Sequence, residues 1–351
     1  MSATQRQRTF DPDRLGPLET WLKSALASPG LAIARAELLG GGAVQENWRL
    51  DVVIDGGPRT GVHRWVLRTD AAVRIPVSLD RSEEFAVLEA AAAAGVKVAK
   101  PIARCEDASV IGAPFLVQAF LQGEAQAIRL VRDPAIAEWG PNVAAELGRQ
   151  LGKLHAIRPE TAPPGLLPLP DGPPARAEVA KLRAVLAKAA DPRPVLEYVL
   201  CWLDRNAPPP PPHLSLVHGD YRTGNYMVDG GELVAILDWE FAHWGDPDED
   251  IGWLCAKCWR FGADDRELGG IASREPFTRP YATAAGRTPD IERIRYWEVM
   301  AAAKWATIAV LQGDRYRTGG EESLELALTG LMAPELELEA LDGLRACEAA
   351  R

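Results

Sequence analysis

The chain has 351 residues, of which 47% are apolar, and its formal net charge at pH 7 is −10. This length supports one large domain or two lobes, and the lack of a basic stripe argues against nucleic acid as a partner. Five scattered cysteines do not suggest a disulfide framework. The polar start MSATQRQRTF and the absence of an apolar run of ~18 residues predict neither a secretory signal nor a membrane span. We therefore expect a cytoplasmic protein without a membrane partner.

The first part of the chain predicts a small sheet with a helix packed on it. Leucines at helical spacing favour an amphipathic helix over 11–28. Two β-prone runs around a Gly-rich turn follow in 31–55, and the stretches HRWVLRTD and APFLVQAFLQG predict further strands. A segment rich in Ala and Glu predicts a helix over 82–94. These elements define an α+β domain, residues 1–118.

The second part, residues 119–351, is predicted to be mainly helical. The stretch NVAAELGRQLGKLHAI has a helical period, and helices are also expected over 177–190 and 194–205. Five prolines, Pro208 to Pro212, form a stiff connector into the next segment. IERIRYWEVMAAAKWATIAVLQG is the longest predicted helix.

The stretch LVHGDYRTGNYMVDGGELVAILDWE combines a hairpin signal with polar residues at wide intervals. The runs NYMV and LVAIL flank Asp-Gly-Gly, and a Gly-rich turn between β-prone runs predicts an antiparallel hairpin. Asn225 and Asp238 lie almost symmetrically about that turn, so we expect an amide oxygen and a carboxylate at its open end. Oxygen ligands of this kind suit Mg²⁺. Asp220, just upstream, adds a separate carboxylate.

The spacing of these residues matches a kinase motif. His218-Gly219-Asp220, four residues and then Asn225 have the form H-R-D-x-x-x-x-N, and Asp238 takes the place of the Asp in D-F-G. The alternative is that they are turn-capping polar residues, which are common in loops. The whole set across one hairpin favours the kinase motif.

LVHGDYRTGN followed by AILDWEFAHWGDP resembles the aminoglycoside phosphotransferase and choline kinase group, in which Gly replaces the Arg of the protein-kinase motif. The resemblance covers about Glu37 to Leu341. It is strongest for the branch related to the kinase-like domain of certain acyl-CoA dehydrogenase proteins, to which YWEVMAAAKWA and SLELALTG are also similar. It implies a bilobal protein-kinase-like fold with a small sheet-based N-lobe and a larger helical C-lobe. It also implies ATP and Mg²⁺ as cofactors and phosphorylation of a small-molecule hydroxyl.

The resemblance also implies residue roles in the motif. Asp220 corresponds to the catalytic base, and Asn225 and Asp238 correspond to the Mg²⁺ ligands. His218 is expected to brace the loop. Arg222 is a candidate cation beside the transferring phosphoryl group, and a surface arginine is an equal alternative.

In the first domain, LLGGGAVQENWRL resembles the loop that covers the phosphates. Gly41, Gly42 and Asn47 are the candidate contacts in this loop, because glycine lets the backbone approach phosphate oxygens closely. An ordinary turn is the alternative for the glycines alone. Glu46 would oppose a triphosphate there unless it points away.

Three further nucleotide-binding assignments rest on the resemblance. Arg68 in WVLRTD stands where the family usually has a lysine, and its helix partner is expected to be Glu84, with Glu83 as the neighbour in question. Backbone groups from Gln118 to Phe120 are expected to bind adenine.

Two features outside these motifs have structural interpretations. Asp250 in GDPDEDIGW is in position to brace the catalytic loop by hydrogen bonding. Cys255-Ala-Lys-Cys258 is a lone CxxC, for which small residues packed beside Trp253 and Trp259 are favoured over metal or redox chemistry.

Three functions stay open at this point. The first is a small-molecule kinase, the second a degenerate kinase-like module that only binds nucleotide, and the third an antibiotic-modifying phosphotransferase. For the acceptor, apolar and aromatic residues after about residue 245 rank a hydroxylated apolar or mixed metabolite ahead of a polycationic sugar. ATP or GTP as donor and the oligomeric state stay open.

Overall fold

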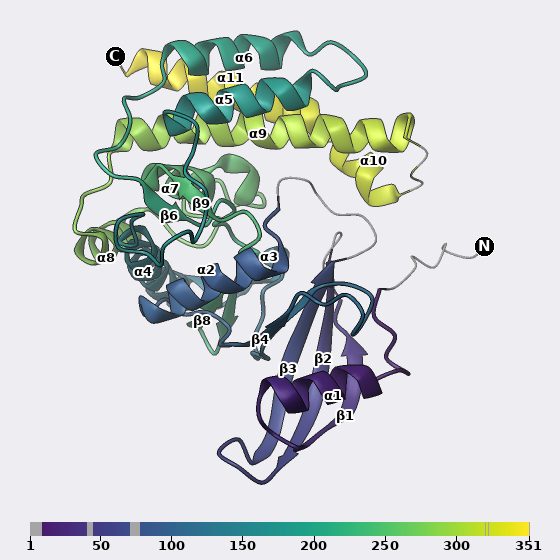
Figure 1. Cartoon of the computed structure of the whole chain (residues 1–351). Coiled ribbons are helices and arrows are strands. Elements are labelled where there is room, and N and C mark those ends of the chain that lie inside the picture. The colour runs from purple at the N-terminus through teal and green to yellow at the C-terminus, as the bar shows by residue number, and fades with distance from the viewer. Residues whose placement is uncertain (1–8, 41–44, 71–77, 320, 322, 351) are drawn as a thin grey trace. The chain divides into compact units, whose positions relative to one another are not determined.

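The computed structural model describes residues 9–40, 45–70, 78–319, 321 and 323–350 (Figure 1). The chain forms two compact units, residues 1–122 with 234–242, and residues 123–233 with 243–351. Residues 234–242 pack with the first unit, although their neighbours in the sequence belong to the second. An antiparallel sheet dominates the first unit and helices dominate the second, which confirms the predicted α+β class.

The first unit is built on a five-stranded sheet whose neighbouring strands are all antiparallel. Its strands are β1 (Gly30–Leu38), β2 (Gln45–Asp55), β3 (Gly61–Asp70), β4 (Pro101–Cys105) and β5 (Phe115–Ala119). Their order is β1-β2-β3-β5-β4. The sequence analysis missed β4, because this strand is short and begins with proline. Proline is tolerated there because β4 lies at the edge of the sheet.

Alternating side chains of β2 form the centre of the first unit's core. Every second residue from Trp48 to Ile54 is at most 2% exposed, and the residues between them are less buried. This period of two is that of a strand with one buried face. The helix α1 (Gly16–Ala25) lies over the sheet in Figure 1 and contributes Leu18 and Leu22 to the same core.

Local start signals determine where the two helices of the first unit begin. The helix α1 begins later than predicted, because Pro17 lies in its first turn, where the fixed φ of proline favours helix initiation. The helix α2 (Arg81–Ala93) is capped by Asp80, whose carboxylate accepts the backbone N–H groups of Ser82 at 2.9 Å and Glu83 at 2.8 Å. The Glu83 carboxylate accepts the N–H of Asp80 at 2.9 Å in return, which completes a capping box.

The second unit is mainly helical. Its longer helices are α4 (Ile136–His155), α5 (Pro174–Leu186), α6 (Pro194–Arg205), α7 (Pro247–Cys255), α8 (Glu275–Ala285), α9 (Ile291–Arg317) and α11 (Ala333–Ala349). Its shorter elements are α3 (Ala127–Val131), the strands β6 (Ser215–Val217), β7 (Tyr226–Asp229) and β9 (His243–Gly245), the 3-10 turn Lys257–Trp259 and α10 (Leu324–Leu331). In the part of the chain that the structure describes, none of the helices has the length and apolar character that a membrane span requires.

The predicted hairpin is confirmed. The strand β7 pairs with β8 (Glu232–Ile236) in a two-stranded sheet. The turn between them contains Gly230 and Gly231, both with positive φ, which is the backbone conformation that a tight hairpin turn requires. A second small sheet pairs β6 with β9 in antiparallel register.

The helix α9 is the central element of the second unit. In Figure 1 it runs alongside α5 and α6, and buried residues of these helices and of α11 form one core cluster. Val299, Met300 and Ala303 of α9 pack in this cluster with Val199 and Leu203 of α6. The apolar stretch that the sequence showed in this helix is therefore a buried helix face.

The helices α4 and α8 approach each other closely at glycine positions. A methyl group on Gly148 would lie 2.3 Å from the carbonyl oxygen of Phe277, and one on Gly152 would lie 2.7 Å from that of Tyr281. The two glycines are four residues apart and so lie on one helix face. Any larger residue there has to push the two backbones apart.

We expect Gly148→Ala to destabilise the protein by about 1–3 kcal/mol, because the added methyl group overpacks the α4–α8 contact. Chemical denaturation monitored by circular dichroism measures the change. The control is Gly16→Ala in α1, where a methyl group would meet no atom within 4 Å. That control should be neutral or slightly stabilising, since alanine is the better helix former. Equal stability of the two variants would contradict the close-packing argument.

Candidate active site

Arg68 is the centre of a buried charge cluster in the first unit. It lies on β3 and is 7% exposed. Its Nε lies 3.1 Å from Glu84 Oε1 of α2, and its Nη2 forms an ion pair with Asp238 Oδ1. Burial opposes the charge, but Glu84 and Asp238 outweigh it and raise the pKa of Arg68 above its ordinary value. Arg68 is therefore a permanent cation in a fixed position.

Glu84, not Glu83, is the partner of Arg68. Glu84 is 1% exposed, and its carboxylate also pairs with Arg81. The Glu83 carboxylate instead accepts the backbone N–H of Asp80 in the helix cap. The sequence analysis preferred Glu84, and the capping box supplies the physical reason, because one of two adjacent glutamates is needed at the N-terminus of α2.

Asp238 lies two residues after the end of β8 in an unusual backbone conformation. Its φ is 63°, in the left-handed region that residues other than glycine seldom adopt. Two residues later, Glu240 is buried and accepts a hydrogen bond from Gln45 Nε2 at 2.5 Å. Burial and the charge of Asp238 raise the pKa of Glu240 to about 7. The first unit thus concentrates carboxylates around Arg68.

The predicted phosphate loop is only partly within the described residues. Gly41 and Gly42 lie outside them. Asn47 lies on β2 directly opposite Arg68 in the β2–β3 register. Glu46 accepts the backbone N–H of Thr9 at 2.7 Å, so it faces the N-terminal segment. Adjacent strand residues point to opposite faces, and Glu46 is therefore on the face away from Asn47.

Part of the segment predicted to bind adenine already forms backbone hydrogen bonds within the sheet. The backbone N–H of Ala119 donates to the carbonyl of Lys100 at 2.9 Å, and that of Phe120 donates to the carbonyl of Arg64 at 2.9 Å. Gln118 is paired on both sides, with β3 and β4. The N–H groups of Ala119 and Phe120 are therefore already hydrogen-bonded. Adenine binding would have to use carbonyl groups of this segment or groups of the residues that follow.

In the second unit, the 218–225 loop is held by the buried carboxylate of Asp250, at the start of α7. Asp250 accepts the backbone N–H of His218 at 2.7 Å and that of Gly219 at 2.9 Å. His155 Nε2 lies 3.0 Å from the same carboxylate. Burial raises the pKa of Asp250, but the His155 contact outweighs it and lowers the pKa below its ordinary value. The structure thus places Asp250 as a brace of this loop.

Gly219 has a conformational reason to be glycine. Its φ is 78°, which is in the left-handed region. The turn lets the backbone N–H groups of His218 and Gly219 both point at Asp250, and the N–H of Asp220 donates to His218 Nδ1 at 3.2 Å. His218 is fully buried and acts as a structural brace in this arrangement.

Asp220 carries the carboxylate of the 218–225 loop, and other side chains hold this carboxylate in place. It is 8% exposed, and three side chains donate to it. Trp253 Nε1 and Arg222 Nε donate to Oδ1 at 2.7 and 3.0 Å, and Asn225 Nδ2 donates to Oδ2 at 2.5 Å. A carboxylate has about four lone-pair directions. Three of them are used here, so the carboxylate is oriented and keeps one direction for a ligand.

Arg222 and Asn225 are both held by contacts around Asp220. The guanidinium of Arg222 also lies over the Trp259 ring, 4.4 Å from its centroid. Asn225 Nδ2 donates to the Asp220 carbonyl as well, at 2.9 Å. The amide nitrogen is therefore committed, and the Asn225 oxygen is the group that suits a cation. An amide oxygen is a ligand that Mg²⁺ accepts, since this ion takes one or two protein oxygens together with phosphate oxygens and water.

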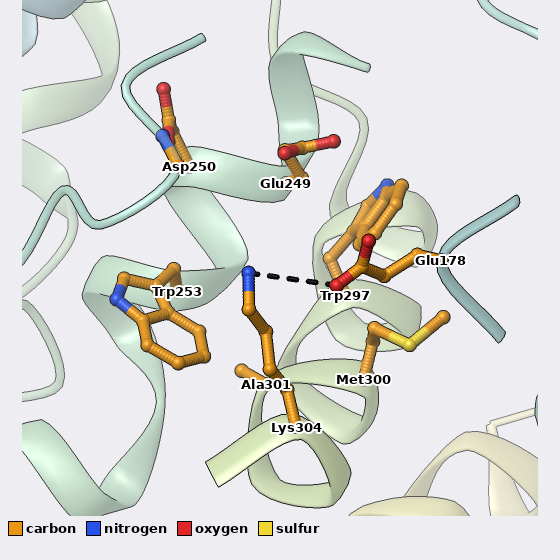
Figure 2. Close-up of a pocket in the computed structure, with 9 residues that line it drawn as sticks. Glu178, Glu249, Asp250, Trp253, Trp297, Met300, Ala301 and Lys304 are labelled. Atoms are coloured by element: carbon orange, nitrogen blue, oxygen red, sulfur yellow. Dashed lines mark hydrogen bonds and ion pairs between the residues drawn. The ribbon is translucent and has the colours of Figure 1, made fainter. Parts of the chain in front are cut away.

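A small pocket lies next to the 218–225 loop in the second unit (Figure 2). Glu178 of α5, Gly219 of the loop, Trp253 of α7, and Trp297 and Lys304 of α9 are among the residues that line it. Because Trp253 also donates to Asp220, one side chain links the pocket wall to the carboxylate.

The sequence analysis missed Glu178 and Lys304 as site residues. Lys304 did have a signal, because it interrupts the apolar run VMAAAKWATIAVL. A charge within a buried helix face needs a partner, and that partner is Glu178, whose Oε1 lies 3.6 Å from Lys304 Nζ. Trp253 and Trp297 are both buried, and both line the pocket.

Of the two cysteines of the CxxC stretch, Cys258 packs against the cluster that contains Trp253 and Trp259, and Cys255 is fully buried. Burial raises the pKa of Cys255 to about 12 and raises that of Cys258 as well, so both thiols stay protonated at neutral pH. Among the described residues, no group of three or more His, Cys, Asp and Glu side chains could hold a metal ion. The packing interpretation therefore agrees with their surroundings.

Comparison with known proteins identifies the class. The model of the phosphotransferase enzyme family matches residues 35–295. The chain belongs to this family. Among curated proteins it is 27% identical over 269 residues to acyl-CoA dehydrogenase family member 11 of Rattus norvegicus, with 73% of this chain and 34% of that protein covered. It is 26% identical over 271 residues to family member 10 of Mus musculus, with 72% and 24% covered. The chain thus spans about a quarter to a third of the length of these relatives.

Solved structures establish the fold. A protein of Ralstonia eutropha, provisionally described as an aminoglycoside phosphotransferase, has a TM-score of 0.75 and 23% identity, with 96% of this chain and 99% of that one covered. A thermostable mutant of aminoglycoside phosphotransferase APH(4)-Ia, in a ternary complex with AMP-PNP and hygromycin B, has a TM-score of 0.57 and 15% identity, with 94% and 98% covered. The predicted protein-kinase-like fold is confirmed.

We expect Asp250→Asn to destabilise the protein by about 1–3 kcal/mol, because an amide group would turn N–H against a buried backbone donor. Because the pKa of Asp250 is lowered, its contribution is fully present above about pH 4 and is lost as the pH falls further. Denaturation at pH 7 and at acidic pH measures both effects. The control is Asp265→Asn, at an exposed aspartate. A variant as stable as this control at pH 7 would rule out Asp250 as the brace.

Proposed function

We propose that the protein is an ATP- and Mg²⁺-dependent phosphotransferase that phosphorylates a hydroxyl group of a small molecule, with Asp220 as the catalytic base. One observation carries the proposal. The Asp220 carboxylate is oriented by three donors, keeps one lone-pair direction, and is linked through Trp253 to the wall of a pocket in the same unit. Membership of a phosphotransferase family supports the reaction class.

In this proposal the residues of the second unit handle the acceptor. Asp220 accepts a hydrogen bond from the acceptor hydroxyl, orients its oxygen for in-line attack, and takes its proton late in a loose transition state. Trp253, Arg222 and Asn225 keep the carboxylate in place during this step. Arg222 also supplies positive charge beside the transferring group.

In the first unit, Arg68 and Asp238 are assigned to the nucleotide. Arginine can form bidentate hydrogen bonds with phosphate oxygens, so it can replace the lysine that the family usually has. Arg68 and Asp238 are ion-paired to each other here. The Asp238 carboxylate and the Asn225 oxygen would hold Mg²⁺, which neutralises developing charge on the phosphates when bound. A solved protein of the same fold binds AMP-PNP, which supports a nucleotide role.

We rank a hydroxylated apolar or mixed metabolite first as acceptor, and an aminoglycoside-type antibiotic second. Relatives with acyl-CoA dehydrogenase names favour the first, and the hygromycin B complex of a protein with the same fold favours the second. ATP turnover with simple alcohols, hydroxyacyl thioesters, choline and aminoglycosides tests the whole proposal. The degenerate-module alternative predicts nucleotide binding without transfer to any of them.

For the base, we expect Asp220→Asn to lower kcat by roughly 10²–10⁴-fold, with ATP affinity little changed. The reason is that an amide cannot accept the hydroxyl proton. Steady-state kinetics and equilibrium nucleotide binding measure the two quantities, and thermal melting checks the fold. Asp229→Asn at the exposed hairpin turn is the control.

Asp238→Ala separates the metal assignment from the base assignment, because it should abolish Mg²⁺-dependent nucleotide binding instead. Unchanged Mg-ATP binding by this variant would refute the assignment of Asp238 as the main metal ligand. Full activity of Asp220→Asn would refute the base.

For the phosphate-binding cation, we expect Arg68→Lys to stay active and Arg68→Ala to raise the KM for ATP. A lysine still presents a positive charge to phosphate, whereas alanine leaves Glu84 and Asp238 without their shared partner. Arg35→Ala, at an exposed arginine of β1, is the control. If Arg68→Ala matches wild type in steady-state kinetics, Arg68 has no role in nucleotide binding and the degenerate-module alternative gains support.

A further inference from the structure

Lys304 places a positive charge in the wall of the pocket next to the 218–225 loop. It lies in the middle of α9, within a helix face whose neighbours Ala303 and Ala306 are fully buried. Figure 2 shows its ammonium group between the Trp253 ring and the Glu178 carboxylate. Nζ lies 5.1 Å from the centroid of the Trp253 ring and 3.6 Å from Glu178 Oε1.

The charge of Lys304 is stable at neutral pH. Burial opposes it, but the carboxylates of Glu178, Glu249 and Asp220 outweigh burial and raise the pKa of Lys304 above its ordinary value. Lys304 is therefore a cation, and it interacts electrostatically with Asp220, the proposed base. Its charge is also available at every pH at which the enzyme would work.

The Lys304 ammonium group still has hydrogen-bonding capacity. An ammonium group has three N–H donors. The contact with Glu178 at 3.6 Å engages at most one of them, and the contact with the Trp253 ring face is electrostatic. The Nε1–H of Trp297, also in the pocket wall, is buried without a hydrogen-bond partner among the described residues. Buried donors of this kind call for an acceptor oxygen from a ligand or water.

The acidic residues of the pocket have cationic or backbone partners of their own. Glu178 pairs with Lys181 at 3.5 Å as well as with Lys304. Glu249 Oε1 lies 2.8 Å from His243 Nε2. Asp250 is used by the backbone of the 218–225 loop. A polycationic acceptor would have to compete with these partners and would meet the Lys304 charge.

The position of Lys304 relative to Asp220 is set by one side chain. The face of the Trp253 ring contacts the ammonium group, and the indole N–H of the same residue donates to Asp220 Oδ1 at 2.7 Å. Gly219, the neighbour of Asp220 in the chain, also lines the pocket. In the arrangement proposed below, the acceptor hydroxyl would face Asp220 and a second oxygen would face Lys304.

We propose that Lys304 is an acceptor-binding residue, which selects hydroxy compounds with a second oxygen acceptor, a carbonyl or a carboxylate, over polycationic amino sugars. The ammonium group donates to that second oxygen, and the ion pair with Glu178 positions it. The inference rests on the proposed phosphotransferase function and narrows its acceptor class.

The test compares wild type, Lys304→Met and Lys304→Arg with 3-hydroxybutyrate, its methyl ester, choline and kanamycin. ADP release gives KM and kcat for each acceptor, and calorimetry gives direct binding of 3-hydroxybutyrate without turnover. We expect Lys304→Met to raise the KM for 3-hydroxybutyrate and its ester at least tenfold, with the KM for ATP unchanged. Lys304→Arg should recover part of the loss, since it keeps the charge.

Lys181→Met is the matched control, because Lys181 pairs with the same glutamate but is exposed. It should stay within twofold of wild type. If Lys304→Met does not fold, the double variant Lys304→Met/Glu178→Gln replaces it, because this variant removes both charges of the pair. Thermal melting identifies which variant to use.

The outcomes separate the two proposals. No ADP release by wild type with any acceptor would count against the phosphotransferase function, and calorimetry would still decide the role of Lys304. The inference is overturned if wild type does not bind or phosphorylate 3-hydroxybutyrate or its ester. It is also overturned if Lys304→Met binds them as wild type does, or if kanamycin is the preferred acceptor of wild type.

Discussion

The 218–225 loop depends on one buried carboxylate. Asp250 is 1% exposed and receives two consecutive backbone N–H groups from this loop together with His155. A buried carboxylate needs such donors, and buried backbone N–H groups need such an acceptor. The Asp250 carboxylate and the backbone N–H groups of the loop therefore each supply the hydrogen-bond partner that the other needs. The arrangement also explains glycine at position 219, where the left-handed turn aligns the two N–H groups. This bracing holds the backbone next to Asp220, and three side-chain donors orient its carboxylate.

Both units hold buried or half-buried charges in pairs or networks rather than singly. Arg68, Arg81, Glu84 and Asp238 form one network in the first unit, and Lys304 with Glu178 forms a pair in the second. Buried ion pairs contribute little net stability, because desolvation offsets their attraction. Their value here is positional, since each network holds a cation in one place. A cation in a fixed position is what phosphate or acceptor recognition requires.

The fold of this family does not by itself identify the acceptor of this chain. Solved aminoglycoside phosphotransferases share the fold at low identity, and the curated relatives have acyl-CoA dehydrogenase names and are much longer. One fold can host several substrates, so the side chains of the site must decide among them. In this chain the pocket walls contributed by Trp253 and Trp297 and the half-buried Lys304 are such side chains. These features are the basis for narrowing the acceptor class.

The sequence by itself determined the features that depend on local patterns. The hairpin after the 218–225 loop followed from Asp-Gly-Gly between β-prone runs, and the motif spacing of Asp220 and Asn225 indicated the class. Most strands of the first unit followed from apolar alternation, but β4 was too short and began with proline. Only the tertiary structure decided the contacts between residues far apart in the chain. It assigned Glu84 to Arg68, committed the N–H groups of residues 119 and 120 to the sheet, and brought Glu178 to Lys304. Periodicity and turn chemistry act over a few residues, whereas ion pairs and pocket walls depend on how whole elements pack.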